Sequence, residues 1–356
     1  MGLSVSPAAD PGAELWSHPA WYGSVMSTGG VAILLNNQAA LWGWDWLVPV
    51  AGLLLLVTSV LAVLLLPRYA VRLRDVRGSG QLASPEGALL ATFPAGVMML
   101  ASAWGRVGPV LVPTSVALAV AAVLCVVGIV AVLWFGQLWL GALIAATTPL
   151  DLVNGGWLIP AVMHLLVPIA LAPVIAAGGP LALPLALVGL AFAGLGLLLF
   201  LFVQSLIVAR LILRPPLPPD LVATAWVPLA PGALLGAALL ALGSASKTAG
   251  LTGVDLGALP VAVAAMGLGF SLWWAVSATL QTRVALRAGP IRRTPGWWAF
   301  VFPTAAVALS LTVIASTLES PPIAGLSLIA AVGVVAVWAF VGVRTMRRGA
   351  RRPAAA

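Results

Sequence analysis

Ten long apolar segments alternate along the chain with short stretches that carry most of its charged residues. A helix needs about 20 apolar residues to cross a bilayer, and most of the segments reach that length. They predict ten membrane-spanning helices, at residues 20–36, 46–67, 87–105, 109–135, 156–177, 181–209, 220–243, 256–283, 296–317 and 322–346. The chain then divides into an N-terminal tail at 1–19, one membrane domain at 20–346 and a basic C-terminal tail at 347–356.

The basic residues fall almost entirely on one side of this arrangement. Only Arg106 and Lys247 lie on the other side, and the remaining fifteen of seventeen sit in loops after even-numbered segments or in the C-terminal tail. Loops rich in Lys and Arg stay in the cytoplasm. The pattern predicts a protein of the cell membrane with both termini cytoplasmic. The fifteen are Arg68, Arg72, Arg74, Arg77, Arg210, Arg214, Arg283, Arg287, Arg292, Arg293, Arg344, Arg347, Arg348, Arg351 and Arg352.

Proline is placed differently in even-numbered and odd-numbered segments. In the even segments it lies near the first turn, where the helix needs no N–H donor; these residues are Pro49, Pro113, Pro184, Pro260 and Pro322. In the odd segments it lies in the interior, where it removes a hydrogen bond and bends the helix; these residues are Pro94, Pro160, Pro168, Pro228, Pro231 and Pro303. The first segment has Gly29 and Gly30 instead, which also loosen a helix.

This alternation predicts an all-α membrane protein built from five hairpins, each with one bent and one straight helix. A backbone group freed by a bend is tolerated in a membrane only where it faces protein or water. We therefore expect the bent, odd-numbered helices to form an inner ring around a central pore. Phe302, beside Pro303, would place a bulky ring at one of the bends.

Composition supports the membrane assignment and narrows the function. The chain is 62% hydrophobic and 7% charged, with a mean hydropathy of +1.12, whereas soluble domains carry roughly 25% charged residues. The net charge of +8 is explained by the one-sided arginines, so we expect no nucleic-acid partner. Cys125 is the sole cysteine, which leaves no intrachain disulfide, and the first nineteen residues lack the basic start of a signal peptide.

Few residues in the segments carry reactive chemistry. His164 is the one titratable group at depth, and it is interpreted either as a helix-interface residue or as a pore-lining or proton-sensing group. Ser24, Thr28 and Thr304 are small polar residues that favour either helix packing or a pore lining. No metal or cofactor is expected, and Asp151 with Asn154 is too sparse a polar group to predict an enzyme.

Charge selectivity follows from the field of the arginines. Fifteen basic residues at the inner mouth would raise the local concentration of anions, and an uncharged lining would place no negative charge in their way. A carbonyl freed by proline favours cations, so the electrostatic argument for anions is incomplete by itself.

Several motifs, spread in order over the chain, resemble one known family. They are Trp21-Tyr22-Gly23-Ser24-Val25-Met26-Ser27-Thr28-Gly29-Gly30, Phe93-Pro94, Gly156-Trp157-Leu158-Ile159-Pro160, Leu229-Ala230-Pro231 and Trp297-Trp298-Ala299-Phe300-Val301-Phe302-Pro303. The sequence is similar to the tellurite-resistance/dicarboxylate transporter family, which includes plant slow anion channels, a bacterial tellurite-resistance channel, and fungal malate and sulfite permeases.

The resemblance implies a quasi-five-fold bundle, an uncharged pore, a homotrimer in the bilayer, and small anions as substrates. It also implies that Phe302 occludes the pore, with Phe93 among the residues that line it. In the dicarboxylate and sulfite branches a second proline follows the fifth-helix proline by three residues, and here that position is Met163. The first hypothesis is therefore an anion channel or uniporter-like permease, and the alternative is a proton-coupled C4-dicarboxylate or sulfite permease that uses His164.

Overall fold

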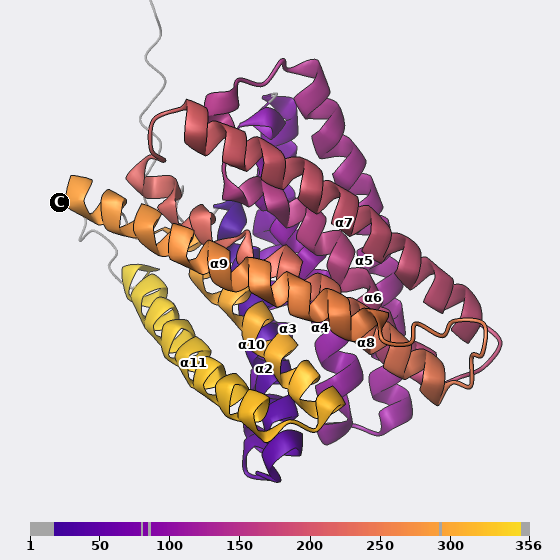
Figure 1. The fold of residues 1–356 in the computed structure, drawn as a ribbon. Coiled ribbons are helices and arrows are strands. Elements are labelled where there is room, and N and C mark those ends of the chain that lie inside the picture. The colour runs from indigo at the N-terminus through magenta and orange to yellow at the C-terminus, as the bar shows by residue number, and fades with distance from the viewer. Residues whose placement is uncertain (1–17, 80, 85–86, 292–293, 350–356) are drawn as a thin grey trace, which may run out of the picture.

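The computed structural model describes residues 18–79, 81–84, 87–291 and 294–349, and this part of the chain is helical throughout, without strands (Figure 1). Ten α-helices follow one another as α2 (Tyr22–Trp42), α3 (Leu47–Gly78), α4 (Thr92–Val107), α5 (Thr114–Ala145), α6 (Ile159–Ala176), α7 (Ala182–Leu213), α8 (Leu229–Thr248), α9 (Leu259–Ala288), α10 (Val301–Leu318) and α11 (Pro321–Gly349). Most of the residues predicted as the two tails lie outside the described ranges.

Nine of the helical stretches in the described residues are long and apolar enough to cross a membrane. The exception among the ten is α2, whose second half carries Asn36, Asn37 and Gln38. Most residues of α2 are nevertheless buried, because it packs against α3, α4, α10 and α11. Protein rather than lipid therefore surrounds its polar face.

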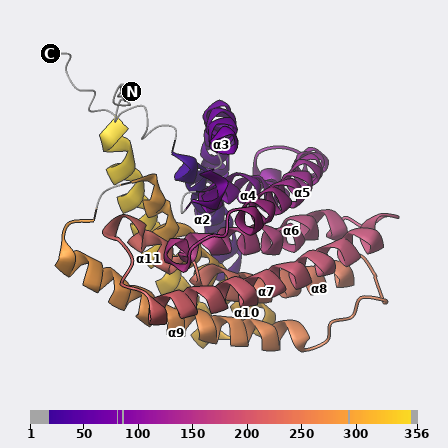
Figure 2. The same cartoon turned by 90° about the horizontal axis from the view of Figure 1, so that it is seen from above.

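The helices form two rings, as the proline alternation predicted. The inner ring is closed, because α2, α4, α6, α8 and α10 each contact the next and α10 returns to α2. Between 56% and 89% of the most apolar stretch is buried in α4, α6, α8 and α10, against 22% to 39% in α3, α5, α7, α9 and α11. In the view from above, α3 and α9 lie on opposite sides of the molecule (Figure 2). The expected quasi-five-fold bundle of five hairpins is confirmed.

A short 3-10 helix precedes every inner α-helix. These segments are η1 (Pro19–Trp21), η3 (Gly87–Ala91), η6 (Gly155–Leu158), η7 (Pro219–Trp226) and η8 (Pro295–Phe300). The prolines that the sequence placed in the interior of the odd segments lie just after these junctions: Pro94, Pro231 and Pro303 are the third residues of their α-helices, and Pro160 is the second.

The sequence predicted that these four prolines bend their helices in the middle. The structure corrects this prediction, because the four prolines lie at the starts of the α-helices. Each predicted span consists of a 3-10 turn followed by an α-helix, and the proline occupies the first turn of the α-helical part, where its missing N–H removes no helical bond. Within α6, Pro168 and Pro173 do lie in the interior. In α2, Gly29 and Gly30 lie mid-helix without ending it.

The outer helices are longer than the apolar pattern predicted. The helix expected at 46–67 continues through Pro67 to Gly78, so Arg68, Arg72, Arg74 and Arg77 are helical rather than loop residues. Arg210 and Arg287 likewise lie in the last turns of α7 and α9. Cations are favourable at helix C-termini, which explains why the arginines extend the helices. The side of the bundle at which these helices end is called the basic end below.

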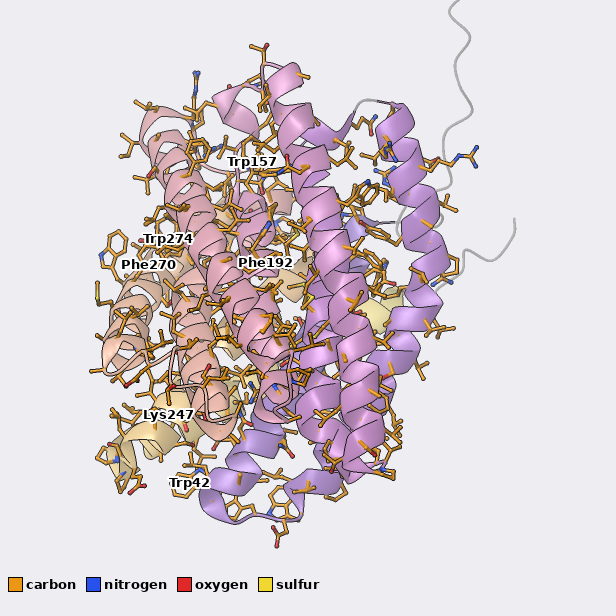
Figure 3. All side chains as sticks on the ribbon, turned by 90° about the vertical axis from the view of Figure 1, so that its right-hand side faces the viewer. Trp42, Trp157, Phe192, Lys247, Phe270 and Trp274 are labelled. Atoms are coloured by element: carbon orange, nitrogen blue, oxygen red, sulfur yellow. The ribbon has the colours of Figure 1, made fainter. Side chains whose placement is uncertain are left out.

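The opposite side, where the inner helices end, is called the far end. In Figure 3, Trp157 of η6 lies toward the basic end, and Trp42 of α2 and Lys247 of α8 lie at the far end. Gln38 joins three helices near the far end. Its amide nitrogen donates to Thr312 Oγ1 of α10 at 2.9 Å and to Ser327 Oγ of α11 at 3.0 Å.

Candidate functional site

A cavity of about 480 Å³ opens at the far end and is lined by all five inner helices. We call it the far-end cavity. Its lining combines aliphatic side chains deep in the bundle with Arg106, Asn37 and several hydroxyl groups nearer the end. The lining residues are Ile33, Asn37, Ala40, Met99, Gly105, Arg106, Ile169, Ala172, Pro173, Ala176, Leu234, Ala237, Leu240, Ala241, Ser244, Ala245, Thr248, Leu309, Thr312, Val313, Ser316 and Thr317.

A second, much smaller cavity of about 40 Å³ lies at the basic end. We call it the basic-end cavity. It is also lined by all five repeats of the bundle, at the junctions between the 3-10 and α-helical parts. Its lining residues are Ala20, Gly23, Met26, Leu89, Thr92, Ile159, Val162, Val227, Pro295, Gly296, Trp298, Ala299, Phe302 and Pro303.

The two cavities share no lining residue, and the distance between them is nearly constant around the ring. The last residue that lines the basic-end cavity and the first that lines the far-end cavity are seven positions apart in four of the five repeats. In α10, both Phe302 and Pro303 line the basic-end cavity, and Leu309 is the first residue that lines the far-end cavity. Leu309 follows Phe302 by seven positions and Pro303 by six. Seven helical residues span roughly 10 Å. A closed layer of that thickness therefore separates the two cavities.

Two rings of side chains border this layer. The basic-side ring consists of Met26, Thr92, Val162, Val227 and Phe302, and the far-side ring consists of Ile33, Met99, Ile169, Leu234 and Leu309. Phe302 is the bulkiest member of the first ring and is only 6% exposed. The second ring is entirely aliphatic, the kind of lining that excludes water from a narrow constriction.

Small residues let the inner helices meet inside the closed layer. By helical spacing, Gly30 and Ala305 lie one turn beyond the basic-side ring on α2 and α10. Both residues are buried, and a Cβ atom placed on Gly30 would lie 3.8 Å from that of Ala305. Small side chains permit such close approach of membrane helices.

Arg106 is the one charged residue that lines either cavity. The sequence placed it just beyond the third helix, but it lies inside α4. The axial space is thus not free of charge, which corrects the expected uncharged pore. Arg106 Nη2 donates to the carbonyl oxygen of Ile169 on α6, at 3.5 Å.

Of the residues expected to line the pore, Phe302 and Pro303 border the basic-end cavity, whereas Phe93 points elsewhere. The ring of Phe93 stacks on Tyr69 of α3, with ring centroids 4.4 Å apart, and meets Tyr22 edge-on at 5.0 Å. In α4 it is the preceding residue, Thr92, that lines the cavity. The Phe93-Pro94 and Phe302-Pro303 pairs therefore differ, because Phe302 borders the axial cavity and Phe93 does not.

The small polar candidates also face away from the two axial cavities. Ser24 Oγ donates to the carbonyl oxygen of Trp21 at 2.7 Å, and Thr28 Oγ1 accepts a hydrogen bond from Trp338 of α11 at 3.1 Å. Thr304 borders a separate lateral cavity between α8, α9, α10 and α11. Of these three hydroxyl groups, that of Thr28 joins an inner helix to an outer one, whereas those of Ser24 and Thr304 bond to the backbone of their own segments.

His164 lies between its own helix and the outer ring. Its Nδ1 is 2.6 Å from the carbonyl oxygen of Pro160, and its ring stacks on Phe192 of α7, with centroids 5.9 Å apart. A Cβ atom on Gly136 of α5 would lie 3.4 Å from the His164 ring. The side chain is 4% exposed and lines neither axial cavity.

A bundle of apolar helices around an axial space, closed at mid-depth, defines a multi-pass membrane protein of the channel or transporter class. The profile of the SLAC1 family, described as voltage-dependent anion channels, matches residues 17–346, and the chain belongs to this family. This confirms the family to which the sequence motifs pointed. The family consists of channels and transporters rather than enzymes, and membership supports anion transport as the general function.

Two curated relatives are uncharacterized transporters of Methanocaldococcus jannaschii. Each is 29% identical to this chain, one over 171 residues and the other over 164. The aligned parts cover 45% and 43% of this chain, and 45% and 44% of the relatives. The match thus spans less than half the length of either relative.

Proposed function

We propose that the protein passes small anions across the membrane along the axis of the inner ring, as a channel or uniporter-like permease, and that Phe302 closes this path. The observation that carries the proposal is the pair of axial cavities lined by the same five repeats of the bundle. They approach each other from opposite ends and are separated by roughly 10 Å of packed side chains.

Phe302 is the best placed side chain to close the path. It borders the basic-end cavity at the level where that cavity ends, and it is the largest residue of the basic-side ring. The residues one turn further on in α10, Ala305 and Ala306, are small and buried. The Phe302 ring therefore supplies bulk that the next turn of α10 lacks.

The charges along the axis support anions as the substrate. Arg106 is the only charged group in either lining, and no Asp or Glu lines the cavities of the described structure. At the basic end, Arg77, Arg210, Arg287 and Arg344 lie near the ends of outer helices. Arginines at the basic end and Arg106 in the far-end cavity, with no acidic residue in either lining, favour negative ions over positive ones along the axis.

The alternative, a proton-coupled C4-dicarboxylate or sulfite permease using His164, gains no support from the geometry. The His164 ring is enclosed by Pro160, Phe192 and Gly136 and borders neither cavity. A proton on this imidazole would have no aqueous path to the axis. We therefore retain the uncoupled pathway as the proposed function.

Orientation and assembly are part of the same proposal. We place the basic end and both termini in the cytoplasm of a cell-membrane protein, because arginines cluster at that end. A homotrimer is expected from the family resemblance. Lipid contacts the outer helices, whose exposed faces are strongly apolar.

The experiment that tests the proposed function is flux through purified protein in liposomes. Chloride, nitrate, sulfite and succinate would be imposed as gradients in turn, with and without a pH gradient, and the membrane potential would be followed. We expect electrogenic flux of anions that does not require the pH gradient. Transport that occurs only with a pH gradient would replace the uniport proposal by the coupled one.

A further inference from the structure

Arg106 occupies an unusual position for a charged residue in a membrane helix. It lies in the last turn of α4, is half-buried, and faces a cavity enclosed by five helices. The structure shows no carboxylate partner for it among the described residues. A cation is favourable in the last turn of a helix, but this one faces a cavity between helices and has no carboxylate partner in the described part of the chain, which makes it a candidate for function.

The position of the guanidinium is fixed by a defect in α6. Pro173 has no N–H, so the carbonyl oxygen of Ile169, four residues earlier, lacks its usual helical donor. Arg106 Nη2 takes that place at 3.5 Å. Gly105 allows the approach, because a Cβ atom there would lie 2.8 Å from the Pro173 ring. The side chain is therefore held against α6 beside the cavity.

Most of the hydrogen-bonding capacity of this guanidinium remains unused. An arginine carries five N–H donors, and the structure gives Arg106 one long hydrogen bond. Asn37, Ser244 and Ser316 line the same cavity, and none of them makes a side-chain hydrogen bond to another described residue. A cation and three polar side chains without hydrogen-bond partners among the described residues thus line one cavity of about 480 Å³.

We propose that Arg106 and the polar residues of the far-end cavity form a binding site for one singly charged anion, and that this site selects which anions reach the closed layer. The proposal rests on the proposed function and specifies its substrate. The planar fork of a guanidinium pairs with two oxygens of an oxyanion, so nitrate fits better than a spherical halide.

The charge count of the cavity sets the valence of the ligand. Arg106 can compensate one negative charge, and the remaining lining is neutral. The second carboxylate of a C4-dicarboxylate would have to sit against hydroxyl and aliphatic groups without a cation, which is costly away from bulk water. The site therefore favours monovalent anions over dicarboxylates.

Equilibrium binding to purified protein tests the site independently of transport. Nitrate, chloride and succinate would be titrated by calorimetry onto wild type and the variants Arg106→Gln, Arg106→Lys and Lys247→Gln. Lys247 is the matched control, because it is an exposed cation near the end of α8 and does not line the cavity (Figure 3).

We expect wild type to bind nitrate more tightly than chloride, and succinate most weakly. Arg106→Gln should weaken nitrate binding by about ten- to a hundredfold, because it removes a charge-assisted pair. Arg106→Lys, which keeps the charge, should bind both monovalent anions but lose the preference for nitrate, and Lys247→Gln should bind as wild type. The Arg106→Lys variant keeps the test informative if Arg106→Gln does not fold.

Two results would overturn the site: no saturable nitrate binding to wild type, or equal losses in Arg106→Gln and Lys247→Gln. Liposome flux separates this failure from that of the proposed function. Anion flux without Arg106-dependent binding would refute the site and leave the pathway standing. Arg106-dependent binding without any anion flux would support the binding site and refute the proposed transport pathway.

Discussion

The guanidinium of Arg106 on α4 donates to the carbonyl oxygen of Ile169 on α6, which Pro173 leaves without its helical donor. A proline in one inner helix thus orients a charged side chain of the next. Both helices line the far-end cavity at this level. The bond connects the proline pattern of the chain with the electrostatics of its axis.

Pro173→Ala should release Arg106 from this bond. Alanine restores an N–H at position 173 that can donate to Ile169, so the guanidinium becomes free to turn fully toward the cavity. Nitrate affinity should then rise by a few-fold in the same calorimetric titration. The double variant Pro173→Ala/Arg106→Gln serves as the control and should bind as weakly as Arg106→Gln alone. A loss of affinity in Pro173→Ala would show that the proline holds Arg106 in its binding position.

The crossing of α8 and α9 depends on glycine at the contact. A Cβ atom on Gly236 would overlap the backbone of Ala264, so the two helices would have to separate. Gly236→Ala should lower the free energy of unfolding by about 1–3 kcal/mol, as overpacking does elsewhere. Gly269→Ala on α9 is the matched control, since a Cβ atom there meets nothing within 4 Å.

Thermal unfolding in detergent measures both glycine variants. The control should be unchanged, or more stable by up to about 1 kcal/mol because alanine favours the helix. Equal melting temperatures for Gly236→Ala and wild type would contradict the close crossing of these helices.

Gln38 should be important for the far end of the inner ring. It donates to Thr312 and Ser327, and its amide oxygen accepts from Trp42 at 2.9 Å. Gln38→Leu removes these bonds and leaves the buried hydroxyl groups of Thr312 and Ser327 with fewer partners, so the protein should lose about 1–3 kcal/mol of stability. Gln81→Leu, at an exposed residue of η2 (Gln81–Ala83), should have little effect. Similar melting temperatures for the two variants would argue against the Gln38 network.

Cysteine labelling tests the orientation. Cys125 is buried and would be replaced by alanine, which leaves a background without thiols. Thr252→Cys at the far end and Ala288→Cys at the basic end both introduce thiols at exposed positions. A membrane-impermeant maleimide added to intact cells should label Thr252→Cys only. Labelling of Ala288→Cys alone would invert the proposed topology.

The sequence was sufficient for the architecture because proline recurs in every hairpin and arginines follow the outer segment of four of the five hairpins. Pro260 and Pro322 lie in the first turns of outer helices, and the Pro303 motif marks an inner one. The pattern could not show that these inner prolines follow a 3-10 turn, because that depends on which hydrogen bonds form before the proline. It also could not show how far α3 continues beyond Pro67.

Which side chains face the axis was harder to predict from the sequence than the positions of the helices. Phe93 and Phe302 both precede a proline, yet the first packs on Tyr69 and the second borders the axis. A rotation of about one residue separates these outcomes, and local sequence does not determine it. Arg106 was assigned to a loop because the apolar segment was predicted to end at residue 105. Pro109, three residues after Arg106, marks the true end of the helix at Val107.

Anion flux through Phe302→Ala, compared with Phe93→Ala, tests the central claim most directly. Both variants remove an aromatic ring beside a proline in an inner helix, but only Phe302 borders the axial path. In liposomes with a nitrate gradient, Phe302→Ala should pass nitrate several-fold faster than wild type, whereas Phe93→Ala should not exceed it. Nitrate flux through Phe302→Ala equal to that of wild type, in protein that is folded and inserted, would contradict the account.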